Sequence, residues 1–118
     1  MTETKTYTGS CHCGAVKFEL KAALDGVGAC NCSICRRVGA VMKSVPTSAF
    51  TLLSGADAML DYQFGKKTAH HPFCKTCGVR THTLWGEGDD AKAIVNLRCV
   101  DGLDVDSLAV TKYDGASF

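Results

Sequence analysis

The segment Cys74-Lys75-Thr76-Cys77-Gly78 contains two cysteines separated by two residues and followed by a glycine. Two intervening residues let a turn direct both sulfur atoms at one ion, and Gly78 supplies a position without a Cβ where the chain bends back toward the metal. This spacing predicts half of a structural zinc site. Because a structural zinc ion usually has four ligands, a second pair of ligands is expected elsewhere in the chain.

The best candidates for the second pair are the two cysteines of Cys11-His12-Cys13-Gly14. Alternating strand geometry would place Cys11 and Cys13 on one face and turn His12 away from their metal, and Gly14 repeats the Cys-Gly ending. We therefore predict a zinc site with four thiolate ligands. Such a site would have a folding role, because it joins segments far apart in the sequence and supplies order that a small core lacks.

A third cluster, Cys30-Asn31-Cys32-Ser33-Ile34-Cys35, places three thiols within six residues. Three ligands define an open zinc site. Three thiolates leave the ion with a net negative charge, which suits an incoming thiol better than water; binding would deprotonate that thiol near neutral pH and keep it nucleophilic. The alternative is a second closed site, and the sequence leaves both readings open. The fourth ligand would then be Cys99, His12, His70, His71 or His82.

Composition indicates where such thiols would be found. The chain has 118 residues, 8 of them cysteine, and a formal net charge of +1. This near-neutral charge argues against a nucleic-acid partner. Residues 1–7 lack the apolar core of a signal peptide, and no apolar run reaches the roughly 18 residues of a membrane-spanning helix. We therefore expect a cytoplasmic protein with no membrane partner, in which clustered thiols bind metal instead of forming disulfides.

Alternating apolar residues predict an all-β protein. In residues 15–22, Val16, Phe18 and Leu20 alternate with charged residues, the period-two pattern of a half-buried strand. No linker or repeat divides the chain, so we predict a single domain over residues 1–118. Further short strands are predicted at residues 39–45, 50–53, 59–64, 68–73, 79–85, 93–97 and 108–113.

Connections and short helices are also predicted. Gly65-Lys66 is typical of a hairpin turn, and residues 86–90 are typical of an exposed loop. Helix signals are limited to single turns. Ser33 is expected to cap a turn that extends through Arg37, and Asp104 or Asp106 is expected to cap one before Leu108.

Three segments together resemble a known protein family. Residues 9–16 (GSCHCGAV), 30–37 (CNCSICRR) and 73–78 (FCKTCG) resemble the glutathione-dependent formaldehyde-activating enzyme (GFA) family, also called the CENP-V/GFA domain. Residues 95–98 are similar to that family's closing strand, so the resemblance covers nearly the whole chain. It implies an Mss4-like fold of coiled antiparallel sheets and two zinc ions per chain. The implied ligands are Cys11, Cys13, Cys74 and Cys77 for a structural ion, and Cys30, Cys32 and Cys35 for a catalytic ion.

The resemblance also implies an activity. The family's named activity is S-(hydroxymethyl)glutathione synthase, a carbon–sulfur lyase. The implied reaction is the reversible addition of glutathione or a related thiol to formaldehyde, with that thiol and an aldehyde as partners. The alternative is a noncatalytic zinc-binding module that recognises another protein or nucleic acid; a closed coordination sphere at the three-cysteine cluster would favour it.

An unpaired edge strand is consistent with a homodimer.

Other polar residues are candidates for substrate binding. Arg36 and Arg37 follow Cys35 directly, so a guanidinium near the open zinc could hold a peptide carboxylate in bidentate fashion. Charge balance or a solvated face is the alternative for either residue alone. His70 and His71 lie on a predicted strand, so at most one of them faces the site, where it could act as a general acid.

The remaining special residues are assigned to packing. Cys99 is expected to be a small buried apolar residue. The aromatic residues Tyr62, Phe64, Phe73 and Trp85 are expected in the core or at a rim and not as a set that stacks on a ligand.

Overall fold

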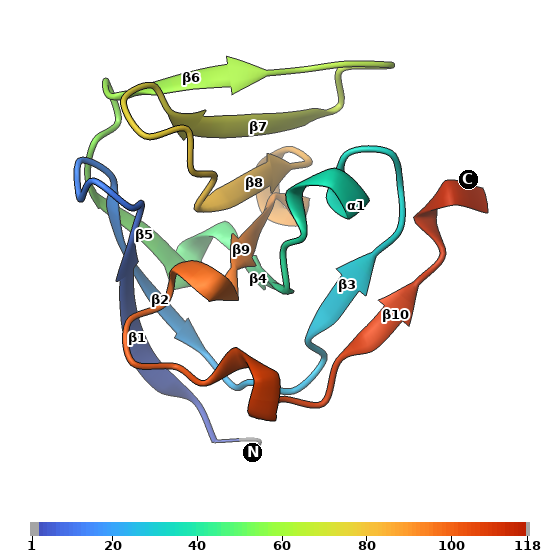
Figure 1. The fold of residues 1–118 in the computed structure, drawn as a ribbon, viewed down its shortest axis with the longest axis horizontal. Helices are drawn as coiled ribbons and strands as arrows, with labels where there is room; N and C mark the ends of the chain where they lie inside the picture. The colour runs from blue at the N-terminus through green and yellow to red at the C-terminus, as the bar shows by residue number, and fades with distance from the viewer. Residues whose placement is uncertain (1–2, 118) are drawn as a thin grey trace.

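The protein is built from two β-sheets (Figure 1). Its structure is a computed structural model that describes residues 3–117. The smaller sheet has the strand order β1-β2-β5, and the larger has the order β10-β3-β4-β9-β8-β7-β6. All pairings are antiparallel except that of β10 with β3. The strands are β1 (Lys5–Ser10), β2 (Lys17–Ala22), β3 (Gly28–Cys30), β4 (Met42–Pro46), β5 (Phe50–Ser54), β6 (Met59–Tyr62), β7 (Ala69–Cys74), β8 (His82–Trp85), β9 (Lys92–Asn96) and β10 (Thr111–Tyr113).

The all-β prediction is confirmed, and each predicted strand overlaps an observed one. Two strands were not predicted. β1 has the sequence KTYTGS, whose side chains are mostly polar and exposed, so it lacks an apolar alternation. β3 has only three residues, too few to show any periodicity. Residues 95–98, expected as the closing strand, are instead the end of β9 and the start of the 3-10 helix η3 (Leu97–Cys99), and β10 follows.

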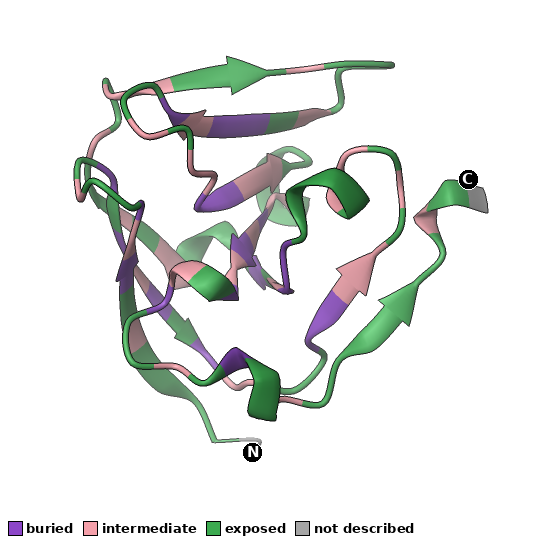
Figure 2. Cartoon of the chain, in the orientation of Figure 1, coloured by how far each residue is buried: buried purple, intermediate pink, exposed green. Residues whose placement is uncertain are grey.

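The main core lies between the two sheets, where Figure 2 shows buried segments on both. β2 has the expected alternation, since Phe18, Leu20 and Ala22 are buried while Lys17 and Lys21 are exposed. Burial of such apolar surface is the main favourable term in folding. The buried side chains of β2 pack against apolar residues of the larger sheet and its connections. These include Val27, Val41, Val45, Ala93, Val95 and Leu97.

The helices are short and occur at connections. The α-helix α1 (Cys35–Val38) begins after Ile34 with no side-chain cap, so the prediction that Ser33 caps this turn is wrong. The predicted turn before Leu108 is the 3-10 helix η4 (Val105–Ser107), and Asp104 accepts hydrogen bonds there through its backbone carbonyl. The others are η1 (Thr47–Ala49), η2 (Gly88–Asp90) and η5 (Gly115–Ser117).

Both predicted connections of the larger sheet are present. Gly65 and Lys66 form the turn between β6 and β7, which is closed by a hydrogen bond from Lys67 N–H to the Phe64 carbonyl at 3.0 Å. Residues 86–90 are exposed and connect β8 to β9, with η2 inside the loop. Within residues 3–117, none of the helices has the length and apolar character needed to span a membrane.

His82 is a buried titratable residue within the packing of β8. Its side chain is 2% exposed, and its ring lies 4.5 Å from that of Phe50, between ring centres. Its Nδ1 lies 2.8 Å from Thr81 Oγ1. Burial lowers the pKa of His82 to about 4, so the folded protein holds a neutral imidazole at pH values where the unfolded chain is protonated.

We predict that His82→Asn makes the protein less sensitive to acid. Between pH 6.5 and about 4 the unfolded state binds an additional proton at His82, so the stability that its neutral form contributes is lost as the pH falls. Over this range, the unfolding free energy of the parent should fall by up to about 3 kcal/mol more than that of the variant. Urea unfolding of both proteins at pH 7 and pH 4.5 measures this difference, and equal losses would contradict it.

Candidate metal centres and active site

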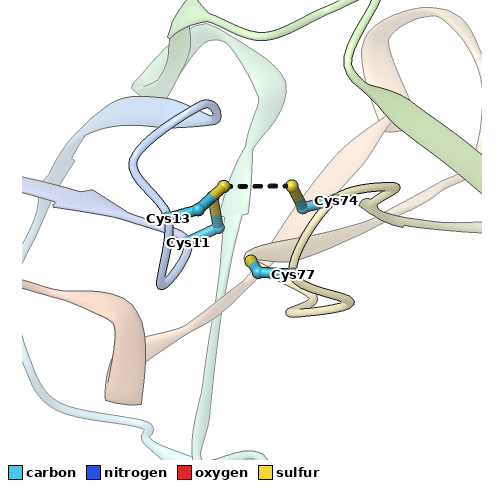
Figure 3. Close-up of side chains that lie close together, drawn as sticks. All are labelled: Cys11, Cys13, Cys74 and Cys77. Atoms are coloured by element: carbon cyan, nitrogen blue, oxygen red, sulfur yellow. Dashed lines mark hydrogen bonds between the residues drawn. The ribbon is translucent and has the colours of Figure 1, made fainter.

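Four cysteines from two distant segments meet at one point (Figure 3). Cys11 and Cys13 follow β1, Cys74 ends β7, and Cys77 lies in the next turn. The four Sγ atoms all lie within 4.8 Å of one another. The Sγ of Cys13 is 3.7 Å from that of Cys11 and 3.6 Å from that of Cys74. Tetrahedral zinc with Zn–S bonds of about 2.3 Å separates its sulfurs by about 3.8 Å, so the group fits a metal ion.

Turns, not strand alternation, bring the members of each pair together. The N–H of Gly14 donates to the Cys11 carbonyl at 3.2 Å, and the N–H of Gly78 donates to the Cys74 carbonyl at 2.7 Å. Both glycines have positive φ, +83° and +79°, which a residue with a Cβ adopts only at a cost. The expectation that Cys11 and Cys13 converge through strand geometry is therefore wrong, since both lie beyond the end of β1.

Backbone N–H groups favour thiolates at this centre. Those of Cys13 and Val79 lower the pKa of Cys77 to about 6. Those of Cys77 and Thr76 lower the pKa of Cys74. Hydrogen bonds to the charged form stabilise it, so the turns that place the sulfurs also offset their charge.

The second group consists of Cys30, which ends β3, Cys32 in the following loop, and Cys35, the first residue of α1. Their Sγ atoms also lie within 4.8 Å of one another. Burial, together with the neighbouring Cys32 side chain, raises the pKa of Cys35 to about 12. Three thiolates this close repel one another, so a bound cation is needed to hold all three deprotonated. The donor set therefore fits a soft or borderline metal ion.

The second group has three members. Within residues 3–117, no fourth cysteine, histidine or carboxylate joins it. The residues considered as a fourth ligand therefore lie outside this group: Cys99, His12, His70, His71 and His82. Cys99 packs against the main core instead, where its Sγ lies 3.7 Å from the Arg80 carbonyl and burial raises its pKa to about 11. This placement fits the interpretation of Cys99 as a small apolar residue.

The three cysteines lie at a cavity of about 630 Å³. Phe64 and Trp85, expected in the core or at a rim, are exposed and form part of its wall. The cavity is concave, mostly apolar and has few polar groups, as is typical of small-molecule sites. Its other lining residues are Ile34, Met42, Gly65, Lys66, Thr68, Ala69, His71, Thr83 and Ile94.

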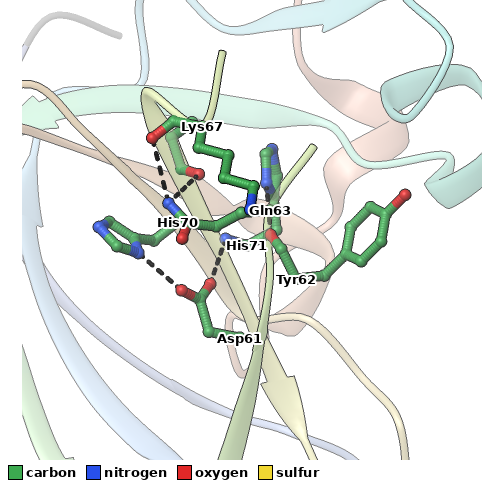
Figure 4. Close-up of polar contacts among 7 residues, drawn as sticks. Asp61, Tyr62, Gln63, Lys67, His70 and His71 are labelled. Carbon is green, nitrogen blue, oxygen red and sulfur yellow. Dashed lines mark hydrogen bonds and ion pairs between the residues drawn. The ribbon is translucent and has the colours of Figure 1, made fainter. Parts of the chain in front are cut away.

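Among the described residues, His71 is the histidine on the wall of this cavity, and Figure 4 shows its polar contacts. Its side chain is buried, and its Nδ1 lies 3.0 Å from the Tyr62 carbonyl, so Nδ1 carries the proton and Nε2 is the acceptor. Burial lowers the pKa of His71, which favours the neutral ring. His70 points to the opposite face, where its Nδ1 lies 2.6 Å from Asp61 Oδ2. The prediction that at most one of them faces the site is confirmed.

Arg36 and Arg37 do not line that cavity. They line a neighbouring hollow of about 390 Å³, whose wall includes Cys32 and Phe64, so the two concavities share these two residues. Both arginines are exposed, and Nη1 of Arg37 donates to the Ser33 carbonyl at 2.7 Å. Both residues thus line a hollow that shares Cys32 with the cavity, and both are accessible to an anionic ligand.

The C-terminal segment holds the three-cysteine loop in place. Nδ2 of Asn31 donates to Asp114 Oδ1 at 2.9 Å, and Oδ1 of Asn31 accepts from the N–H of Ala116 at 3.0 Å. Gly115, between them, lies so close to Cys30 that a Cβ would collide with its sulfur. These contacts join residues more than 80 positions apart, and no pattern in the sequence indicated them.

Arg80 was also missed by sequence reasoning. Its Nε is buried without a hydrogen-bond partner among the described residues. Burial lowers the pKa of Arg80, and the charge of a Cys35 thiolate opposes that shift. The one feature of the sequence that could have indicated a role for Arg80 is its position, three residues after Cys77. Arg80 therefore adds positive charge near the three-cysteine group.

The chain matches a known protein family over most of its length. Residues 6–111 match the family model described as GFA, glutathione-dependent formaldehyde-activating enzyme. The chain belongs to the GFA family. A crystal structure of a Rhodobacter sphaeroides protein is similar to this GFA chain, with 34% identity and a TM-score of 0.80. That match covers 90% of this chain and 98% of the other. The coiled, largely antiparallel sheets expected for this family are present.

We predict that Cys74→Ser removes the metal of the four-cysteine group and destabilises the fold. Binding of a structural metal contributes on the order of 10 kcal/mol to small metal domains, so the variant should melt at a much lower temperature or be unfolded. Circular dichroism melting and metal content per chain measure this loss. The matched control is Cys99→Ser, a half-buried cysteine outside both groups, which should keep both metals. Equal melting of the two variants would contradict a structural centre.

We predict that Gly115→Ala disturbs the three-cysteine group alone. The new Cβ would collide with Cys30 Sγ and lie 3.1 Å from Cys32 Cβ, so metal content should fall from two ions to about one per chain. The control is Gly102→Ala, where nothing lies within 4 Å and only the positive φ of +71° is strained. That control should cost about 1 kcal/mol and keep both ions. Two ions in Gly115→Ala would contradict the prediction.

Proposed function

We propose that this protein is a zinc-dependent carbon–sulfur lyase of the S-(hydroxymethyl)glutathione synthase type. It would promote the reversible addition of glutathione or a related thiol to formaldehyde. The observation that supports this proposal most strongly is the three-cysteine group at the cavity, with no fourth ligand among the described residues, in a member of the GFA family. An open metal site is the arrangement expected for catalysis rather than for structure alone.

We propose zinc as the metal at both centres. All seven donors are cysteine sulfurs, which favour zinc over magnesium, calcium or manganese. One ion would be structural, held by Cys11, Cys13, Cys74 and Cys77, and the other catalytic, held by Cys30, Cys32 and Cys35. We also propose that the protein is a single domain and lies in the reducing cytoplasm, where clustered thiols bind metal instead of forming disulfides.

The reaction transfers one proton and forms one bond. The S–H bond of the thiol breaks, a C–S bond forms to the carbonyl carbon, and the proton ends on the carbonyl oxygen. When bound by the three thiolates, zinc would lower the pKa of the substrate thiol and keep its sulfur nucleophilic. Nothing is oxidised or reduced, so neither an electron acceptor nor an electron donor is required.

The chain's own residues would handle the proton and the charge. His71 Nε2, the acceptor atom of a neutral ring, would take the thiol proton and return it to the oxygen of the adduct. Arg36 and Arg37 would hold a carboxylate of the thiol, since guanidinium and carboxylate match in geometry. The apolar walls of the cavity would exclude water and strengthen the interaction of His71 with the thiol.

We predict that Cys35→Ser keeps the fold and one metal but loses catalysis. Exchange NMR on a mixture of formaldehyde and glutathione measures the rate of addition. Because the uncatalysed addition is itself appreciable, only the rate in excess of the uncatalysed rate is informative. The excess should fall to the uncatalysed level in Cys35→Ser and persist in the control Cys99→Ser. Equal rates in parent and Cys35→Ser would contradict the proposal and favour a noncatalytic zinc-binding module.

A further inference from the structure

The cavity at the three-cysteine group is more apolar than formaldehyde requires. Formaldehyde carries only hydrogen on its carbonyl carbon, yet the cavity has a volume of about 630 Å³. Its walls include Ile34, Met42, Phe64, Trp85 and Ile94. Two hydrogen substituents are too small to fill a cavity of this volume.

The charges around the site do not favour placing a peptide thiol in that cavity. Glutathione carries two carboxylates and an ammonium group at neutral pH. Among the described residues, Lys66 is the one ionic side chain on the cavity wall besides the cysteines and His71. The guanidiniums of Arg36 and Arg37 line the neighbouring hollow. The polar part of the thiol therefore matches the hollow, and the apolar cavity remains for the other reactant.

The cavity and the neighbouring hollow meet at the place where the sulfur of the substrate thiol would bind. Cys32 and Phe64 belong to the walls of both. A thiol whose carboxylate binds in the hollow can thus present its sulfur at the three-cysteine group, and a carbonyl carbon joined to that sulfur extends into the cavity. A substituent on that carbon would pack against Phe64 and Trp85, which are 40% and 50% exposed in the free protein.

We infer that the cavity binds an apolar substituent of the aldehyde, so that the substrates include aldehydes with an aliphatic chain or an aromatic ring. This inference rests on the proposed function, whose thiol and chemistry it keeps. Burial of apolar surface in a preformed concave site increases affinity with each added methylene. The proton and bond changes are the same as for formaldehyde.

The test uses thioethers of glutathione that carry no reactive thiol. S-Hexylglutathione and S-methylglutathione share the peptide and differ only in the apolar group that the cavity would receive. Trp85 is the single tryptophan of the chain and lies on the cavity wall, so its fluorescence reports binding directly. On the zinc-loaded full chain, the hexyl compound should bind at least about tenfold more tightly, since each buried methylene contributes about a three- to fourfold gain.

A pair of matched variants locates this preference. Phe64→Ala removes an exposed ring from the cavity wall and should abolish most of the hexyl preference. Leu53→Ala removes an apolar side chain that is 55% exposed on β5, outside the described cavities, and should leave the preference unchanged. Equal affinity of both thioethers for the parent, or equal loss in both variants, would overturn the inference.

Exchange NMR with glutathione and either formaldehyde or hexanal separates this inference from the proposed function. Hexyl preference together with a greater catalysed excess for hexanal supports both. Catalysed exchange of formaldehyde alone, without hexyl preference, overturns the aldehyde inference and leaves the lyase proposal standing. Hexyl preference without catalysed exchange of either aldehyde overturns the lyase proposal and, with it, the assignment of the cavity to an aldehyde.

Discussion

The convergence of four sulfur atoms from Cys11, Cys13, Cys74 and Cys77 connects the two sheets at one point. The hairpin of β6 and β7 depends on this connection, because β7 pairs with β8 at only two positions, Ala69 with Trp85 and His70 with Leu84. A second, small apolar cluster of Cys11, Val16 and Cys74 packs at the same place. A metal at this centre would therefore fix the far end of a hairpin that the sheet itself holds weakly.

The position of that hairpin matters because it forms one side of the cavity. His71 lies on β7, and Phe64 lies at the turn that joins β6 to β7. The opposite side is built from the three-cysteine loop and α1, which the C-terminal segment holds through Asn31. A metal at the four-cysteine centre would thus act on the candidate active site indirectly, by fixing the wall that faces the three cysteines.

The sequence predicted the three-cysteine group and each pair of the four-cysteine group because those spacings are local. It joined the two pairs because a structural zinc ion usually has four ligands. It predicted β2 because the alternation of that strand is strong. It missed β1 and β3, which are polar or very short, and it assigned the convergence of Cys11 and Cys13 to a strand where a turn acts. The cavity could not be predicted, since its wall combines residues from Cys30 to Ile94. The contact of Gly115 with Cys30 depends on the parallel pairing of β10 with β3, which has no local sequence signal.

The two centres differ in how their cysteines are distributed along the chain, and this difference matches the separate roles proposed for them. A metal bound by ligands from distant segments would hold the fold together, so exchanging one of these ligands would weaken the connection between the two sheets. The three cysteines of the other centre lie within six residues, so a metal there would connect no distant segments, and its fourth position would be free to change partner. In the proposed reaction, the place of the three cysteines between a cationic hollow and an apolar cavity would let one sulfur meet a charged reactant on one side and an apolar one on the other.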